Sequence, residues 1–239
     1  MQSLPKRIPN EHNKIGAIIV AAGSSQRMDG MDKIFSPLLG RPLISYSLEA
    51  FISSPDITDI VLVLSRQNAK KGEALIKTKG WSNTITIRVG GDRRQDSVRL
   101  GLEGLLNTDW TTVHDGARPC VNTHTISQGL SEARKTGAAV AALPVSNTIK
   151  TVDTNMFVKK TLPRNQLWTI QTPQVFRTEI LYQAHCRIGR EVTDDAEMVE
   201  QAGYPVSVFL GSHENIKVTT SADLLIAETL LRARKNQNH

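Results

Sequence analysis

The chain is poor in cysteine and in aromatic residues, and it has no long apolar run. Only Cys120 and Cys186 are present, without a CxxC pair, which argues against a zinc site and against a disulfide framework. No segment approaches about 18 consecutive apolar residues, so we expect no transmembrane helix. Aromatic residues are only 5% and do not cluster with cations, so we expect no surface for stacking nucleic-acid bases. These features favour a reduced, cytoplasmic protein that binds neither membranes nor nucleic acid.

The net charge of +6 is spread thinly along the 239 residues. Apart from Arg93-Arg94 and the tail around residues 232–235, the cations are scattered. Such a balance favours acidic small molecules, for example phosphorylated substrates. Residues 1–13 are polar, lack the apolar stretch of a signal peptide and are expected to be a disordered leader. We find no repeats or low-complexity linker, so residues 14–239 are predicted to form a single domain.

Short apolar runs alternate with amphipathic stretches along most of the chain. Strands are predicted at 18–20, 60–64, 85–89, 111–113, 138–143, 168–170 and 206–210, and helices at 43–51, 69–79, 96–106, 123–135, 179–189, 194–202 and 221–234, with Thr193 and Ser221 as N-caps of the last two. This alternation predicts an α/β fold with a mostly parallel sheet and helices on both faces. Ligands bind beyond the carboxyl ends of such strands, so we expect the loops at 21–33, 90–97 and 114–119 to converge there.

The first of these loops has the composition of a phosphate site. The apolar run Ile18-Ile19-Val20 is followed by Ala21-Ala22-Gly23-Ser24-Ser25 and then by the cations Arg27 and Lys33. Successive backbone N–H groups in a turn of small residues can cradle an anion, and the two cations can neutralise it. The loop lacks the Gly-Lys-Ser/Thr of a Walker A motif and the three glycines of the dinucleotide fingerprint. The alternative is an ordinary connection with two solvated cations.

The alternation is interrupted between residues 144 and 173. Residues 148–152 and 157–161 read as two strands, with the turn residues Asp153-Thr154-Asn155 between them. An isolated hairpin cannot bury its own apolar face. We therefore predict an inserted β-hairpin arm that packs on a second subunit.

Two charged loop residues are candidates for the site. Asp115 follows a short strand and is a fit ligand for Mg²⁺; the alternative is a surface Asp paired with Arg118. Lys217 precedes the last helix, and a lone lysine is more often solvated. No triad accompanies His114, so a packing or hydrogen-bonding role is favoured over that of a general base. By themselves, Gly90-Gly91-Asp92 could be a simple turn.

Six motifs together resemble one family. They are AAGSSQRM…K, GGDRRQDSV, VHDGARP, NTIK, QTPQVF and ENIKVT, and they occur in the order found in 2-C-methyl-D-erythritol 4-phosphate cytidylyltransferases, over roughly residues 15 to 232. That family is similar to the broader nucleotidyltransferases with a Rossmann-like fold. The resemblance implies transfer of CMP from CTP to methylerythritol phosphate, with Mg²⁺ as cofactor and release of pyrophosphate, in non-mevalonate isoprenoid synthesis.

The resemblance also implies roles for individual residues. Arg27 and Lys33 would hold the triphosphate, Asp115 would bind the metal, and Arg164 and Lys217 would position the acceptor phosphate. A nucleotide-binding set is implied at Ala21, Ala22, Gly23, Ser24, Gly91, Asp92 and Ser97, and a substrate-binding set at Thr148, Arg164 and Lys217. On sequence alone, Thr148 and Arg164 would be taken as structural. In the family the arm crosses between subunits, so a homodimer is implied.

Some positions depart from the family pattern. Asp32 stands where Pro usually precedes the lysine, Ser25 replaces a second glycine, and Asn147 stands where Asp is frequent. These changes leave Arg27 and Lys33, the two cations of the nucleotide side, in place, whereas Asn147 lies on the acceptor side. A ribitol 5-phosphate cytidylyltransferase and a non-catalytic nucleotide-binding protein on the same scaffold remain alternatives.

Overall fold

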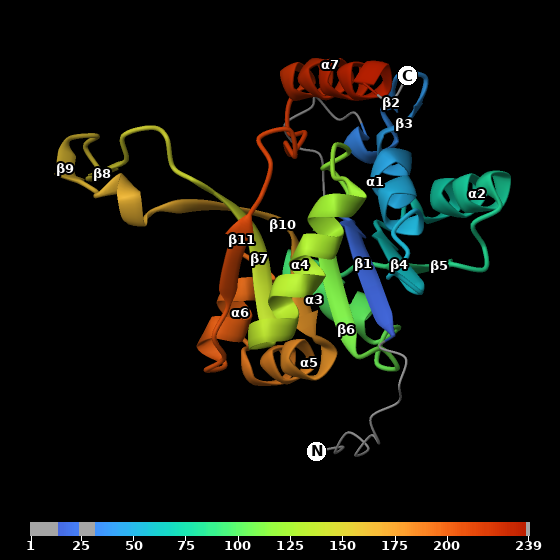
Figure 1. Cartoon of the computed structure of the whole chain (residues 1–239), viewed down its shortest axis with the longest axis horizontal. Helices are drawn as coiled ribbons and strands as arrows, with labels where there is room; N and C mark the ends of the chain where they lie inside the picture. Colours follow the sequence, from blue (N-terminus) through green and yellow to red (C-terminus); the bar gives the residue numbers. More distant parts are fainter. Residues whose placement is uncertain (1–13, 24–31, 238–239) are drawn as a thin grey trace.

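A seven-stranded sheet forms the centre of the protein in a computed structural model that describes residues 14–23 and 32–237 (Figure 1). The strands lie in the order β11-β7-β10-β6-β1-β4-β5. Their bounds are β1 Ile15–Ala21, β4 Asp59–Leu64, β5 Ile85–Val89, β6 Trp110–Asp115, β7 Ala138–Pro144, β10 Trp168–Arg177 and β11 Ser207–Leu210. Within this sheet β10 runs antiparallel to its neighbours β6 and β7, and the other neighbouring pairs are parallel. The predicted mostly parallel sheet is confirmed.

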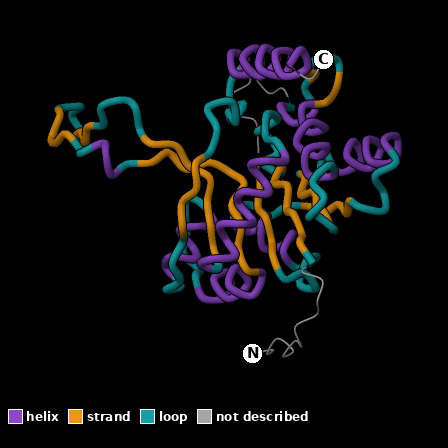
Figure 2. Tube along the Cα trace, viewed as in Figure 1, coloured by secondary structure: helices purple, strands orange, loops and turns teal. Residues whose placement is uncertain are grey.

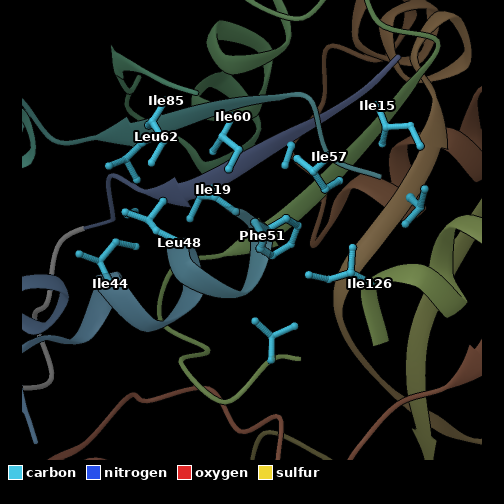
Figure 3. Close-up of a cluster of buried hydrophobic side chains, with 14 of the residues drawn as sticks. Ile15, Ile19, Ile44, Leu48, Phe51, Ile57, Ile60, Leu62, Ile85 and Ile126 are labelled. Atoms are coloured by element: carbon cyan, nitrogen blue, oxygen red, sulfur yellow. The ribbon is translucent and has the colours of Figure 1, made fainter. Parts of the chain in front are cut away.

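Helices cover both faces of this sheet, as predicted (Figure 2). Their bounds are α1 Leu43–Ile52, α2 Ala69–Lys79, α3 Arg94–Leu102, α4 Thr123–Thr136, α5 Thr178–Arg187, α6 Asp195–Gln201 and α7 Ser221–Gln237, with short 3₁₀ turns η1 Lys33–Phe35 and η2 Arg164–Gln166. On one face, Ile19 of β1 packs with Leu48 and Phe51 of α1 (Figure 3). On the other face, Ile18 packs in a second cluster with Val98 of α3. Successive side chains of a strand point to opposite faces, so β1 is buried on both.

The strand order places a ligand site at the end of β1. β1 pairs with β4 on one side and with β6 on the other, and all three run parallel. Their carboxyl ends therefore lie at one edge, where the strand order reverses direction along the chain. α7 packs beyond this edge, with Ala227 in a third apolar cluster that includes Leu43 and Val218.

The N-terminus of α6 differs from the prediction. Its N-cap is Asp194, whose carboxylate accepts the Glu197 backbone N–H at 2.8 Å. The predicted cap, Thr193, instead donates its own N–H and hydroxyl to the Glu197 side chain, at 2.7 and 2.8 Å. The helix therefore begins at Asp195, one residue later than the predicted start at 194.

Two further helix starts also differ. α3 begins before the predicted start because the Asp96 carboxylate reaches back to the Arg93 backbone N–H at 3.2 Å, as capping residues do. Ser221 lies inside α7, and the preceding hydroxyl of Thr220 accepts the Asp223 N–H at 3.3 Å. The cap of α7 is therefore one residue earlier than predicted.

The segment between β7 and β10 extends away from the sheet, with β8 and β9 at its tip (Figure 1). β8 Lys150–Val152 and β9 Val158–Thr161 pair antiparallel and are shorter than the strands expected there. All of their side chains are exposed. The role of this hairpin as a dimerisation arm stays a prediction.

Two expectations about the whole chain are left open. The predicted leader at residues 1–13 lies outside the described residues. The prediction of a single domain over residues 14–239 is likewise untested. No helix in the described ranges is long and apolar enough to cross a membrane.

Candidate active site

Small residues from three elements meet at the carboxyl edge of the sheet. A Cβ placed on Gly90, after β5, would overlap the Cβ of Ala22 and lie 2.6 Å from the Ser97 hydroxyl oxygen. That hydroxyl donates to the Gly91 carbonyl at 3.4 Å. The structure thus brings Ala22, Gly91 and Ser97 together, from the end of β1, the loop after β5 and α3. We call these residues, with Ala21, Gly23 and Gly90, the small-residue cradle.

The cradle adjoins the loop after β6. The Gly116 N–H donates to the Val20 carbonyl at 2.9 Å, and a Cβ on Gly116 would lie 3.0 Å from the Cβ of Ala21. The convergence expected for the loops at 21–33, 90–97 and 114–119 is therefore seen for their described parts. Asp92 and Gly23 are exposed at the rim of the cradle.

The remaining residues of the first loop are only partly placed. The predicted nucleotide ligands Ser24 and Arg27 lie outside the described residues. Lys33 begins η1, which packs on α1, and its neighbour Ile34 is buried in the core cluster that contains Ala21. The roles of Ser24 and Arg27 stay predictions.

A buried carboxylate surrounded by cations lies at the end of β6. Oδ2 of Asp115 is 2.8 Å from Lys217 Nζ and 3.7 Å from Arg118 Nε, and Oδ1 is 3.4 Å from Arg94 Nη2. Burial acts to raise the pKa of Asp115, but attraction to Arg94, Lys217 and Arg118 holds that pKa well below its ordinary value. The carboxylate is ionised at neutral pH. The alternative of a surface Asp paired with Arg118 names a true partner but is wrong about the surface, because the side chain is buried among three cations, which we call the cation cluster.

A chain of hydrogen bonds fixes the backbone of this loop. The Asp115 N–H donates to the Thr172 hydroxyl at 3.0 Å, and this hydroxyl lies 3.0 Å from His114 Nδ1. His114 Nε2 lies 3.3 Å from the Arg118 carbonyl, which fits a tautomer with its proton on Nε2. Burial lowers the pKa of His114 to about 4, so the ring is neutral at neutral pH. These contacts support the hydrogen-bonding role favoured for His114.

Lys217 is held at the cluster by the residues on either side of it. The Asn215 side-chain amide donates to the Thr172 carbonyl at 2.7 Å, and the Val218 N–H donates to the Ala117 carbonyl at 2.8 Å. These bonds join the segment before α7 to β10 and to the loop after β6. Lys217 is therefore not simply a solvated lysine, although 43% of its side chain is exposed.

Sequence reasoning missed two charged residues of the site. Arg94 donates Nη1 to Asp195 Oδ2 at 2.7 Å while its Nη2 faces Asp115. Asp195 is 1% exposed, and its Oδ1 lies 3.9 Å from His185 Nε2. Burial opposes the charge of Arg94, but the two carboxylates outweigh it and raise the pKa of this guanidinium. The Arg93-Arg94 pair was visible in the sequence, but nothing there distinguished the member that faces inward.

The predicted acceptor-binding residues of the arm lie apart from this cluster. Thr148 and Arg164 are exposed, and Arg164 Nη1 donates to the Ser146 carbonyl at 2.8 Å. Both belong to the segment that extends away from the sheet (Figure 1). The structure brings Lys217 and Asp115 together but does not bring Thr148 and Arg164 of the same chain to them.

The described residues include no group of three or more His, Cys, Asp or Glu side chains arranged to hold a metal ion. Asp115 can supply one carboxylate oxygen, and Mg²⁺ commonly uses one or two carboxylates together with substrate phosphates. Its two oxygens face Lys217 and Arg94. A metal ion would gain one of these oxygens only if substrate phosphates drew the cation paired with it away from Asp115.

Comparison with known proteins gives a consistent picture. A family model for 2-C-methyl-D-erythritol 4-phosphate cytidylyltransferase matches residues 15–233. The chain is 48% identical over 221 residues to such a cytidylyltransferase from Dehalococcoides mccartyi, covering 92% of this chain and 97% of that one. It is 39% identical over 226 residues to the Bacillus licheniformis enzyme, covering 93% and 97% of the two chains.

Comparison with solved structures points to the same family. The 4-diphosphocytidyl-2C-methyl-D-erythritol synthase of Anaerococcus prevotii matches with a TM-score of 0.82 at 27% identity, over 93% of this chain and 97% of that one. The 2-C-methyl-D-erythritol 4-phosphate cytidylyltransferase of Thermus thermophilus matches with a TM-score of 0.74 at 32% identity, over 90% and 98%. With matches of this extent in sequence and in fold, the chain belongs to the 2-C-methyl-D-erythritol 4-phosphate cytidylyltransferase family.

Proposed function

We propose that this enzyme transfers CMP from CTP to 2-C-methyl-D-erythritol 4-phosphate, giving 4-diphosphocytidyl-2-C-methyl-D-erythritol and pyrophosphate for isoprenoid precursor synthesis. Family membership supports the reaction. The observation in the structure that supports it best is the cation cluster around Asp115, next to the small-residue cradle. Two anionic substrates need cations where they meet, and a nucleotide needs a backbone that it can approach closely.

On the nucleotide side, the cradle would pass under CTP. Ala22 and Gly23 leave room for the ligand at the end of β1, and Gly91, Asp92 and Ser97 would contact the cytidine. Arg27, Ser24 and Lys33 would hold the triphosphate. Neutralising the phosphates favours attack at the α-phosphorus and departure of pyrophosphate, because phosphoryl-type transfer depends mostly on positioning and charge.

On the acceptor side, Lys217 would bind the phosphate of methylerythritol phosphate. One oxygen of that phosphate attacks the α-phosphorus of CTP, forming a new P–O bond. The bond between the α-phosphorus and the bridging oxygen breaks, and its electrons leave on pyrophosphate. Lys217 is suited to this role because its side chain is partly exposed and its amine needs only to change partner, from Asp115 to the incoming phosphate. Arg164 and Thr148 would complete the acceptor site.

Mg²⁺ is part of the proposal. Asp115 and Asp195 carry two negative charges against the three positive charges of Arg94, Arg118 and Lys217, so the described cluster has a net charge of about +1. Two phosphorylated substrates would exceed this charge several-fold. Asp115 would hold the ion together with the phosphates, and when bound the ion would supply neutralising charge to them.

A homodimer would bring the arm to the site. Several apolar side chains of the projecting segment are exposed, including Met156 at 78% and Phe157 at 70%. Contact with a second copy would cover them and would carry Thr148 and Arg164 to a partner's cluster. We also place the enzyme in the cytoplasm, in keeping with its two free cysteines, Cys120 and Cys186.

The proposal is tested by pyrophosphate release. The full-length protein is given CTP and Mg²⁺ with either methylerythritol phosphate or ribitol 5-phosphate, and each mixture is repeated with EDTA. We expect release with methylerythritol phosphate, loss of release with EDTA, and little release with ribitol 5-phosphate. Release only with ribitol 5-phosphate would show that the acceptor is wrong, and silence with both would contradict the transfer reaction.

The variant Lys217→Ala is measured in the same experiment. It removes the amine next to Asp115 and should lower kcat/KM for the acceptor by a hundredfold or more, an order of magnitude typical of groups that stabilise transition-state charge. Lys235→Ala, a similar change at an exposed lysine of α7, is the matched control. Equal activity of the two variants would contradict the role of Lys217.

A further inference from the structure

Asp32 begins the short turn that carries Lys33. Its carbonyl accepts the Phe35 N–H at 3.2 Å and the Ser36 hydroxyl at 3.0 Å. The Lys33 carbonyl accepts the Ser36 N–H at 3.3 Å. The backbone of η1 is therefore closed by hydrogen bonds to the carbonyls of Asp32 and Lys33.

The Asp32 side chain fastens this turn to a different element, α2. Its Oδ1 accepts the Asn68 side-chain amide at 3.0 Å, and its Oδ2 lies 3.0 Å from Lys71 Nζ. Asn68 is the N-cap of α2, so the carboxylate also lies at the end of the helix where its dipole favours negative charge. Lys71 Nζ in addition lies 5.6 Å from the centre of the Phe35 ring, so one lysine of α2 contacts both ends of the turn.

These contacts connect Lys33 to the frame of the sheet. α2 follows β4, which pairs directly with β1. Ile34 holds one side of the turn in the core and η1 packs on α1, but a lysine side chain has four flexible bonds. The side chain can be delivered to one place only if its backbone is held. The bonds from Asp32 to Asn68 and Lys71 add a second hold at the residue directly before Lys33, on the side of α2.

We propose that Asp32 is a positioning residue, which by fastening η1 to the N-terminus of α2 sets the point from which Lys33 reaches the triphosphate of CTP. The inference rests on the proposed function, because it takes Lys33 as a ligand of those phosphates. Asp32 itself touches neither CTP nor the reacting atoms and acts only through Lys33. Its loss should therefore weaken the use of CTP without a matching loss of folding stability.

The backbone of Asp32 offers a test by conservative rescue. Its φ of −71° lies within the range of about −65 ± 15° that a proline ring imposes. Asp32→Pro removes the carboxylate but restricts the same backbone by a different means. Asp32→Ala removes the carboxylate and leaves the backbone free. A positioning role predicts that the proline variant keeps more activity than the alanine variant.

The first measurement is steady-state kinetics with CTP varied at saturating acceptor. Asp32→Ala should raise KM for CTP and lower kcat, with a combined loss in kcat/KM of about ten- to a hundredfold, as expected for misplacement by an ångström or so. KM for the acceptor and the melting temperature should change little. Asp32→Pro should recover a large part of the loss. Lys70→Ala, at an exposed lysine next to Lys71 on α2, is the matched control and should behave as wild type.

A second comparison separates this inference from the proposed function. Lys33→Ala is measured alone and combined with Asp32→Ala. If Asp32 acts through Lys33, the double variant loses no more than Lys33→Ala alone. Full activity of Lys33→Ala would contradict the role of Lys33 itself and, with it, the inference.

Two outcomes would overturn the positioning role while leaving Lys33 intact. The first is that Lys33→Ala is inactive while Asp32→Ala has the kinetics of the wild-type enzyme. The other is additive losses in the double variant, which would mean that Asp32 acts independently. Should Asp32→Ala not fold, the variant Asn68→Ala/Lys71→Ala removes the same two contacts from the side of α2 and is judged by the same change in KM for CTP.

Discussion

Among single residues, the members of the cation cluster differ in how firmly they are held. Arg118 donates Nη1 to the Asn215 carbonyl at 2.7 Å, and Arg94 is bound to the buried Asp195. Lys217 pairs with Asp115 through a side chain that is 43% exposed. The two arginines are therefore suited to provide a fixed positive field. Lys217 is the cation best able to move to a substrate phosphate, at the cost of one partly solvated ion pair.

His114 makes a prediction about stability at low pH. Its folded pKa of about 4 is below the ordinary value of 6.5, because burial disfavours the charged ring. The unfolded chain thus binds a proton more readily, so the contribution of His114 to stability is complete above pH 6.5 and is lost as the pH falls toward 4. The loss amounts to about 3 kcal/mol. Urea unfolding followed from pH 7 to 4 should show this decline.

The variant His114→Gln isolates that contribution. Glutamine can accept from Thr172 and donate to the Arg118 carbonyl but does not titrate, so its stability should fall less steeply over the same pH range. His185 is also buried with a lowered pKa and titrates in the same direction. It is present in both proteins, so it cancels in the comparison. Identical slopes for the two proteins would contradict the assignment.

The same residues show why sequence reasoning found only part of the site. Asp115 was identified from its place after a short strand and Lys217 from its resemblance to a family motif, and the structure puts them in contact. Asp195 could not be found, because an acid in the first turn of a helix reads as a favourable partner of the helix dipole. Its contact with Arg94 joins residues 101 positions apart, and only the packing of α3 near α6 creates it. Asp32 was noted only as a departure from the family pattern.

At the scale of elements, the site depends on how closely three backbones approach. Gly90 lies where β1, α3 and β4 meet, and its missing Cβ leaves room for Ala22, Ser97 and Val63. Gly90→Ala would force these elements apart. We expect a loss of about 1–3 kcal/mol in the free energy of unfolding, the usual cost of overpacking. The cradle would also be distorted, so KM for CTP should rise.

Two other glycines separate the effect on stability from the effect on CTP binding. Among the described residues, no atom lies within 4 Å of a Cβ built on Gly23 or on Gly189. Gly23→Ala points into the space proposed for CTP, so it should raise KM for CTP without destabilising the fold. Gly189→Ala, in the loop after α5, should change neither quantity. Urea unfolding and CTP kinetics on the three variants test the set, and a Gly90→Ala as stable as wild type would contradict the packing argument.

The elements themselves were largely predictable because their signals are local. α2 and α4 end at Gly80 and Gly137, which both adopt left-handed conformations that favour glycine, and the sequence placed both ends within one residue. Helix ends without such a glycine were less accurate: α3 was predicted to end at 106 but ends at Leu102, and α7 was predicted to end at 234 but ends at Gln237. After Leu102 the chain continues in i→i+3 turns, with the Gly104 and Leu105 N–H groups donating to the Gly101 and Leu102 carbonyls, and these turns keep the apolar spacing of a helix. The full extent of β10 could not be predicted either, because its long antiparallel pairing with β7 and β6 is a tertiary contact.

At the scale of the whole molecule, the projecting segment sets the geometry of the acceptor site. Thr148 and Arg164 belong to a segment that extends away from the sheet (Figure 1). If both take part in the reaction, they must serve the site of another copy. Two-fold pairing would exchange the arms symmetrically, so that each site combines Lys217 of one chain with Arg164 of the other.

This arrangement predicts complementation between two defective chains. Arg164→Ala and Lys217→Ala should each be nearly inactive as homodimers. A heterodimer of the two, purified through different tags, would contain one site with both substitutions and one site with neither. It should therefore recover about half of the wild-type activity. Light scattering must first show a dimer of the full chain. A heterodimer no more active than the two single-variant homodimers would mean that Arg164 and Lys217 act within one chain. Full activity of a monomer would mean that the arm of a second chain takes no part in the active site.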